Sequence, residues 1–280
     1  MAEVFGFDCY SPGEIAERVE NVGVTKAQLP LTCMSALGVL AGGFIGLGAM
    51  FFTLVASDTS LSFAVSRVLG GLVFSLGLVL VVVAGAELFT GNNLLVMAWV
   101  SRRTSTAKLV ENFAVVYLAN LIGAVGLAGL VTLSGHANMQ NGAVGRTAVS
   151  IAAAKCALPF SEAFFKGVLC NVLVCLAVWI AIAGRNVSDK ILAIVFPITA
   201  FVACGFEHSV ANMYFIPLGL LLRPDFDPNH LDAALTWGGF ARNLLPVTLG
   251  NVLGGAGMVG FVYWIIYRRS AASPAAPTSK

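Results

Sequence analysis

GAELFTGN at residues 85–92 and GFEHSVAN at residues 205–212 are the two most informative segments of this sequence. Both fit the pattern G-x-E-x4-N, and each interrupts a long apolar run, at 68–100 and at 191–222. Such runs are longer than the roughly 20 helical residues that cross the apolar layer of a bilayer. A polar, glycine-containing interruption at that depth predicts a transmembrane helix that stops and restarts inside the membrane.

The composition supports a membrane location for most of the chain. Of 280 residues, 58% are hydrophobic and 11% are charged, and the mean hydropathy is +0.88. The net charge of +2 and the short, scattered basic clusters make nucleic acid an unexpected partner. The six cysteines form no CxxC pair, so we interpret them as packing residues and expect no disulfide, metal or cofactor.

The apolar runs predict an all-α polytopic membrane protein with six transmembrane helices, of which the second and fifth are broken. The predicted spans are 31–56, 68–100, 110–133, 163–184, 191–222 and 243–267. Residues 1–30 are expected to form a cytoplasmic segment whose part 11–27 is an amphipathic helix. Residues 31–268 form the transmembrane domain, and 269–280, rich in Ala, Ser and Pro, are expected to be a disordered cytoplasmic tail.

Positive charges in the loops predict the orientation. Ten Lys and Arg residues fall on the side of both termini and six on the other, so both termini are expected in the cytoplasm. The ten are Arg18, Lys26, Arg102, Arg103, Lys108, Arg185, Lys190, Arg268, Arg269 and Lys280, and the six are Arg67, Arg146, Lys155, Lys166, Arg223 and Arg242.

A second short pattern indicates an internal repeat. The third run contains NLIG at 120–123 and the sixth contains NVLG at 251–254. Residues 31–133 are therefore expected to repeat as 163–267. Because three spans is an odd number, the second copy would enter the membrane from the opposite side, which gives an inverted repeat.

The interruptions carry the polar chemistry. Glu87, Glu207 and His208 are ionisable groups at membrane depth, where each is a candidate functional residue. A helix that restarts there presents free N–H groups and the positive end of its dipole, which attract an anion. The hydroxyl of Thr90 can donate a hydrogen bond to it, and His208 can donate a hydrogen bond or a proton. Glycine, at positions 85, 91 and 205, is expected to allow the breaks.

Structural roles compete with functional ones at these positions. We interpret Glu87 and Glu207 as acceptors of the backbone N–H groups that their own helix breaks release. His208 could be a satisfied histidine between helices, and the Thr90 hydroxyl could bond to its own helix. Asn171 and Asn251 are expected to hold neighbouring backbone across helix interfaces.

Over essentially its whole length the chain resembles the formate/nitrite transporter family, most specifically in AELFTGNN at 86–93 and GFEHSVANMYFIPLG at 205–219. The resemblance implies a homopentamer in the bacterial inner membrane, with an aquaporin-like fold and a pore in each protomer and lipid in the central hole. Formate is the implied substrate. The implied site is the pair Thr90 and His208, with apolar slits at Leu78, Leu88 and Phe89 and at Phe74 and Phe201, an outer lysine, Lys155, and supporting asparagines, Asn171 and Asn251.

On this reading the anion crosses one slit, meets the central pair and leaves through the other slit, as the anion or as the neutral acid after taking a proton from His208. Passive passage and proton-coupled symport both stay open. A nitrite transporter of the same fold is the alternative. The Asn-Pro-Ala motifs of a glycerol pore are absent. No enzyme is expected, because Ser209 and His208 are adjacent and no GxSxG or HExxH motif is present.

Overall fold

The computed structural model describes residues 9–227 and 233–269, which are helical apart from short connections. The predicted tail at 269–280 lies outside this part of the chain except for its first residue. Five helices among the described residues are long and apolar enough to cross a membrane: Leu31–Ala56, Phe63–Gly85, Thr106–Leu133, Phe160–Ala183 and Trp237–Tyr267. The chain is therefore an all-helical membrane protein.

The helices follow one another along the chain with short connections. They are α1 (Pro12–Ala27), α2 (Leu31–Ala56), α3 (Phe63–Phe74), α4 (Leu76–Val79), a π-helical turn (Leu80–Gly85), α5 (Phe89–Asn92), a 3-10 turn (Asn93–Leu95), α6 (Val96–Val100), α7 (Thr106–Leu133), a 3-10 turn (His136–Asn138), α8 (Met139–Cys156), α9 (Phe160–Ala183), α10 (Val187–Ala203), α11 (Ser209–Phe226), α12 (Trp237–Val252), a π-helical stretch (Leu253–Phe261) and α13 (Val262–Tyr267).

Both predicted interruptions break the helix. Gly85 adopts φ +86° and Gly205 φ +73°, the left-handed region that favours glycine. The extended residues Leu88 and His208 then precede the restarting helices α5 and α11. The expectation for Gly91 was wrong, because it lies inside α5 and its φ is not positive. The fifth run is thus two shorter helices, α10 and α11.

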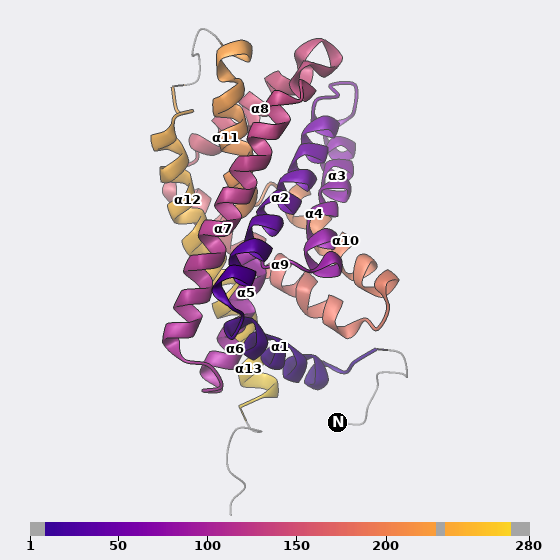
Figure 1. The fold of residues 1–280 in the computed structure, drawn as a ribbon. Coiled ribbons are helices and arrows are strands. Elements are labelled where there is room, and N and C mark those ends of the chain that lie inside the picture. Colours follow the sequence, from indigo (N-terminus) through magenta and orange to yellow (C-terminus); the bar gives the residue numbers. More distant parts are fainter. Residues whose placement is uncertain (1–8, 228–232, 270–280) are drawn as a thin grey trace, which may run out of the picture.

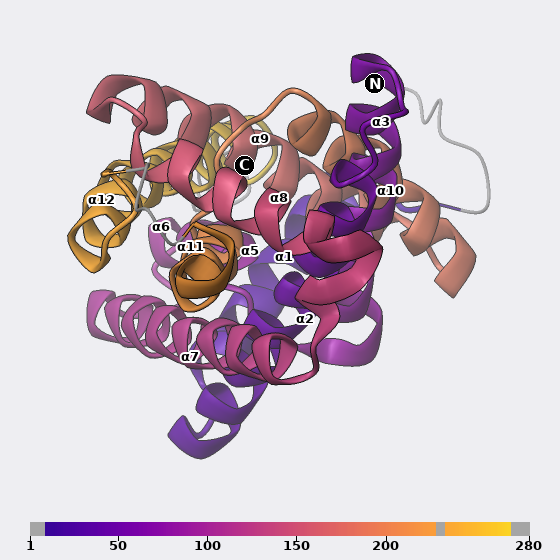
Figure 2. The same ribbon diagram turned by 90° about the horizontal axis from the view of Figure 1, so that it is seen from above.

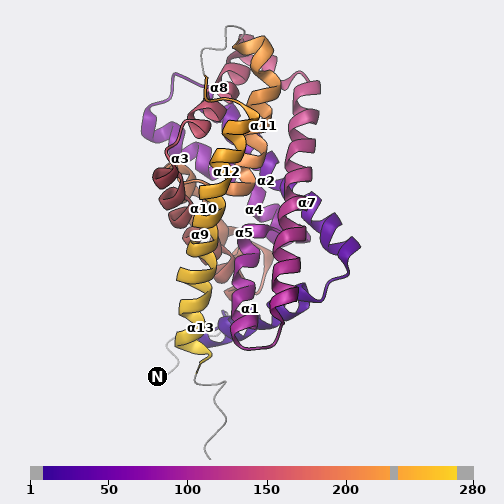
Figure 3. The same cartoon turned by 90° about the vertical axis from the view of Figure 1, so that its left-hand side faces the viewer.

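The helix α1 lies across one end of the molecule, the end that also holds α13 (Figures 1 and 3). Its start is a capping box in which Ser11 and Glu14 bond to each other's backbone N–H. Its buried Glu20 forms ion pairs with Arg103, at 3.0 Å, and with Arg268, at 2.9 Å. These contacts place the two ends of the described chain on one side.

Glycine lets the long helices approach closely. A Cβ atom at Gly123 of α7 would overlap the carbonyl of Val39 on α2, and one at Gly254 would overlap the carbonyl of Val168 on α9. These are the glycines of the two N-x-x-G patterns, so each pattern marks a close helix crossing. Figure 2 shows α3 and α10, the first halves of the two broken helices, lying together away from α7.

The helix α8 was not predicted. No element is predicted between 133 and 163, where α8 runs after a left-handed kink at residues 140–142. It lies at the opposite end of the molecule from α1 (Figure 1). Its apolar side is mostly Ala and Val and packs on α11, and its last turn carries Lys155.

Candidate functional site

Two cavities lie on either side of the helix breaks. The Lys155 vestibule has a volume of about 240 Å³, and its lining includes Arg67, Phe74, Lys155, Lys166, Phe201 and His208. The Lys26 vestibule has a volume of about 510 Å³, and its lining includes Lys26, Leu37, Gly85, Leu88, Val178 and Lys190. Each vestibule therefore carries lysine and ends at one of the breaks.

Thr90 and His208 meet between these cavities. Their Oγ1 and Nε2 atoms are 2.8 Å apart, and the two residues are 0% and 3% exposed. His208 lines the Lys155 vestibule, whereas Leu88, two residues before Thr90, lines the Lys26 vestibule. That this pair lies on the path of a solute stays a prediction.

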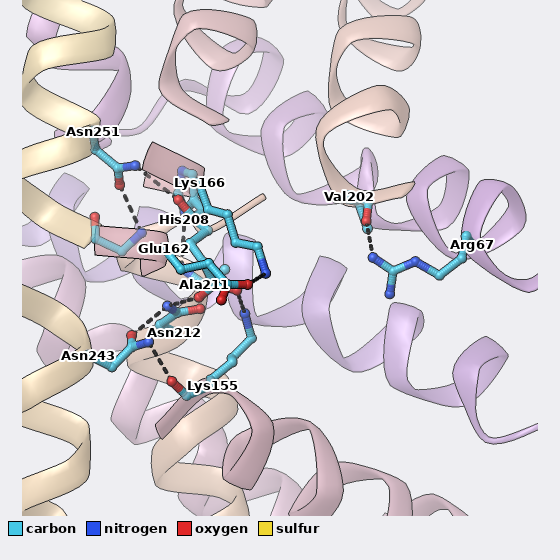
Figure 4. A network of polar contacts seen from close by, with 12 residues as sticks. Arg67, Lys155, Glu162, Lys166, Val202, His208, Ala211, Asn212, Asn243 and Asn251 are labelled. Carbon is cyan, nitrogen blue, oxygen red and sulfur yellow. Dashed lines mark hydrogen bonds and ion pairs between the residues drawn. The ribbon is translucent and has the colours of Figure 1, made fainter. Parts of the chain in front are cut away.

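The ring of His208 is held by its own helix. His208 is the N-cap of α11, and its Nδ1 accepts the backbone N–H of Ala211 at 3.0 Å (Figure 4). We infer that the neutral ring carries its hydrogen on Nε2 and donates it to Thr90. The ring of Phe201 lies nearly parallel to that of His208, with centroids 5.9 Å apart.

The two glutamates bond to side chains. Glu87 pairs with Lys26 at 3.0 Å and accepts from Asn92 at 2.7 Å. Glu207 pairs with Lys155 at 2.8 Å and accepts from Asn212 at 2.6 Å. The sequence-based expectation that each accepts backbone N–H groups at its own break needs correction. The E-x4-N spacing instead joins the glutamate before each restarted helix to the asparagine in that helix's first turn.

Asparagines satisfy the broken backbone. Asn120 accepts from the N–H of Phe89 at 2.9 Å and donates to the carbonyl of Glu87 at 2.9 Å. Asn251 accepts from the N–H of Ser209 at 2.9 Å and donates to the carbonyl of Glu207 at 3.0 Å. The first N–H group of each restarted helix is therefore occupied by protein, so for these two groups the expectation of a free N–H was wrong.

The two breaks also share the hydrogen bonds that their asparagines make with a second asparagine. Asn92 donates to Asn112 at 2.9 Å, as Asn212 donates to Asn243 at 2.7 Å. Asn112 then donates to the carbonyl of Lys26 at 3.4 Å, as Asn243 does to that of Lys155 at 2.8 Å. Sequence reasoning missed Lys26, Asn112, Asn120 and Asn243 as members of the site. The signal available was a polar residue inside or beside each apolar run.

The remaining predicted residues are distributed as follows. Phe74 and Phe201 line the Lys155 vestibule and contact edge to face, with centroids 5.6 Å apart. Asn171 donates to the carbonyls of Thr90, at 3.3 Å, and Asn251, at 2.6 Å. Leu78 is buried, and the ring of Phe89 packs on Phe113 and Tyr117 of α7. Their place in a slit stays a prediction.

Comparison with known proteins identifies the family. A model of the formate/nitrite transporter family matches residues 13–265. The chain is 39% identical to the formate channel FocA of Escherichia coli strain K12 over 274 residues, covering 94% of this chain and 96% of that one. It is 37% identical to FocA of Haemophilus influenzae over 261 residues, which cover 89% and 92% of the two chains.

Solved structures agree. A pentameric formate channel with formate bound is similar with a TM-score of 0.76 and 35% identity, over 85% of this chain and 97% of that chain. An ion channel described as a member of the FNT family is similar with a TM-score of 0.80 and 33% identity, over 90% and 98%. The chain belongs to the formate/nitrite transporter family.

Proposed function

We propose that this protein passes formate, and related small monovalent anions, across the bacterial inner membrane through a pore in each protomer. The observation that carries the proposal is the buried contact between Thr90 and His208, which lies between two cavities that each hold lysine. The relatives named formate channels, and the solved channel that holds formate, point to the same substrate.

The central pair suits an anion that has lost its water. When Nε2–H of His208 donates to Oγ1 of Thr90, the hydroxyl hydrogen of Thr90 is left to donate to a carboxylate oxygen. A neutral donor binds the anion less tightly than an unpaired cation would, so the anion can leave again. Aromatic rings on one side, Phe74 and Phe201, and Leu88 on the other line the approaches.

Proton transfer from His208 has less support. A doubly protonated ring would place an N–H group on Nδ1, against the N–H group of Ala211. That form loses the N-cap bond and gains two facing donors. The geometry therefore favours His208 as a hydrogen-bond donor over His208 as the source of a proton for symport.

We also propose six spans in an inverted repeat, with the aquaporin-like fold that the family resemblance implies. The support is the matching of contacts at the two breaks, in which Lys26, Glu87 and Asn120 correspond to Lys155, Glu207 and Asn251. The repeat then begins at the short helices α1 and α8 and is longer than the predicted 31–133 and 163–267. The excess of Lys and Arg in the loops on the side of the termini indicates that the Lys26 vestibule and both termini face the cytoplasm.

The assembly proposed is a homopentamer with membrane lipid in its centre, as the pentameric relative suggests. Residues 1–30 are its cytoplasmic segment, 31–268 its channel domain and 269–280 its tail. Reporter fusions after Ser101 and after Ser134 test the topology, because the proposal places these two loops on opposite sides of the membrane.

Flux into liposomes tests the substrate. Purified protein is reconstituted, and the initial rates of formate, nitrite and glycerol entry are compared with those of empty liposomes. The proposal expects formate entry to exceed nitrite entry and glycerol entry to match empty liposomes. Faster nitrite than formate would assign the protein to the alternative, a nitrite transporter of the same fold. No anion entry would overturn the proposal.

A further inference from the structure

The Lys155 vestibule holds three cations whose surroundings differ. Lys155 pairs with Glu207 at 2.8 Å, and Lys166 pairs with Glu162 at 2.6 Å. Among the described residues, Arg67 has no carboxylate oxygen within 4.0 Å. The positive charge that these side chains leave uncompensated in the cavity therefore resides on Arg67.

The guanidinium of Arg67 is held in place by the end of another helix. Arg67 lies in the second turn of α3, and its Nε donates to the carbonyl of Ala203 at 3.0 Å and its Nη2 to that of Val202 at 2.7 Å. These are the last residues of α10; the carbonyl of Val202 also accepts the N–H of Gly205 at 3.0 Å, and the guanidinium lies at the negative end of the helix dipole. Figure 4 shows the side chain reaching from α3 to Val202, apart from Lys155 and Lys166.

Two of the five N–H groups of Arg67 are used in this way, and Nη1 makes no such bond. The side chain is half-buried and lines the cavity next to Gly205. A Cβ atom at Gly205 would lie 3.1 Å from Nη2, so glycine at the break also leaves room beside the guanidinium. The group is thus fixed, charged and open on the side of the cavity.

We propose that Arg67 is the docking residue of the Lys155 vestibule, where a small carboxylate anion binds before it reaches His208. A planar guanidinium that is already oriented by two carbonyls presents its remaining N–H groups to a carboxylate at little entropic cost. Its position at the helix break links docking to the entrance of the pore. The inference rests on the proposed function and adds a residue that neither break motif contains.

The competing explanation is that Arg67 only caps α10. The two roles respond differently to salt. Attraction of an anion by an exposed charge is screened, with a Debye length of about 30 Å at about 10 mM salt and about 3 Å at about 1 M. Loss of the two hydrogen bonds that cap α10 would persist at high salt, because salt screens only the charge–dipole part of that contact. Lysine keeps the charge but cannot reproduce the planar two-carbonyl contact.

The test measures initial formate flux in liposomes, at low and at saturating formate and at low and high salt, for the wild type and the variants Arg67→Gln and Arg67→Lys. At low salt and low formate, Arg67→Gln should lower flux by about three- to tenfold, with little change at high salt or saturating formate. Arg67→Lys should keep most of the salt-dependent flux. Arg146→Gln removes a charge from an exposed site outside the vestibule and should behave as wild type.

Two results would overturn the inference. One is Arg67→Gln flux equal to that of the wild type at low salt, and the other is a loss of the same size at low and high salt, which would leave only the capping role. Both require that the wild type carries formate. A wild type without formate flux would instead refute the proposed function, and the docking role with it.

Discussion

Ala211 donates its backbone N–H to Nδ1 of His208 at a distance of 3.0 Å, and this contact decides which ring nitrogen meets Thr90 as a donor. With Nδ1 occupied as an acceptor, Nε2 carries the hydrogen and meets Thr90. The same bond caps α11. One side chain therefore fixes the start of a helix and supplies the buried polar contact with Thr90, which we propose lies on the anion pathway.

Replacement of Thr90 separates the hydroxyl from the shape of the side chain. Thr90→Val keeps the volume but leaves Nε2–H of His208 without an acceptor in a buried site, where such a loss is worth about 1 to 3 kcal/mol. Formate flux in liposomes should fall about tenfold or more. Thr90→Ser keeps the hydroxyl and should conduct at a rate near that of the wild type. Equal flux in Thr90→Val and Thr90→Ser would show that the hydroxyl has no part in passage.

The ion pair of Lys26 with Glu87 should be structurally critical. The side chain of Glu87 is 6% exposed, so Lys26→Met leaves a buried carboxylate unpaired and should destabilise the protein by about 3 kcal/mol or more. Adding Glu87→Gln should recover much of this loss. Lys108→Met breaks an exposed pair with Glu111 and should have an effect of about 0.5 kcal/mol or less. Thermal unfolding in detergent measures all of them, and similar unfolding temperatures for Lys26→Met and Lys108→Met would contradict this account.

The repeat predicts equal consequences at Asn120 and Asn251. Each is fully buried and bonds to three backbone groups, so replacement by alanine should destabilise by about 3 kcal/mol or more. Protonated aspartic acid keeps the acceptor oxygen and one O–H donor, and should give a smaller drop in unfolding temperature than alanine. A large effect at one position with none at the other would argue against equivalent roles.

The first turn of α1 should respond to acid only at low pH. The pKa of Glu14 lies below its ordinary value of 4.5, because the backbone N–H and the hydroxyl of Ser11 donate to its carboxylate. A lowered pKa means that the cap is complete above the unfolded-state pKa and is lost as the pH falls through the folded-state pKa. The turn should therefore stay intact at pH 5 and above.

A spin label on Cys9, in a variant with Cys33 and Cys204 replaced by serine, reports this turn, because these three are the exposed cysteines of the described chain. Its mobility should rise only below a pH of about 4.5, and Glu14→Gln should remove the dependence. A transition between pH 5 and 7 that survives in Glu14→Gln would place the control of α1 at another group.

The sequence predicted the breaks well. A charged residue at membrane depth is costly unless it has partners or lines a cavity, and an adjacent glycine allows the irregular backbone that such a site needs. It could not predict which side chains satisfy them. Thr90 and His208 are 118 residues apart, and only the family resemblance predicts that they meet. The helix α8 escaped prediction because its alanine-rich sequence is too short and too weakly amphipathic to stand out between two longer apolar runs.

Partner choice explains the other errors. Both glutamates were expected to accept backbone N–H groups, which Asn120 and Asn251 accept instead. A glutamate carboxylate and an asparagine amide oxygen can both accept a backbone N–H group, and which of them does so depends on which helix lies close to the break. Gly91 carried the same composition signal as Gly85, but only Gly85 needs a positive φ.

Formate flux through His208→Asn tests the central claim most directly. Asparagine is a good N-cap and should preserve α11, but it removes the ring nitrogen that meets Thr90, whereas His208→Ala removes both. Between pH 5 and 8, the account predicts that His208→Asn unfolds at nearly the wild-type temperature while its formate flux falls by about tenfold or more. A His208→Asn protein that passes formate at the wild-type rate, with the wild-type pH dependence, would contradict the claim that the anion passes this pair.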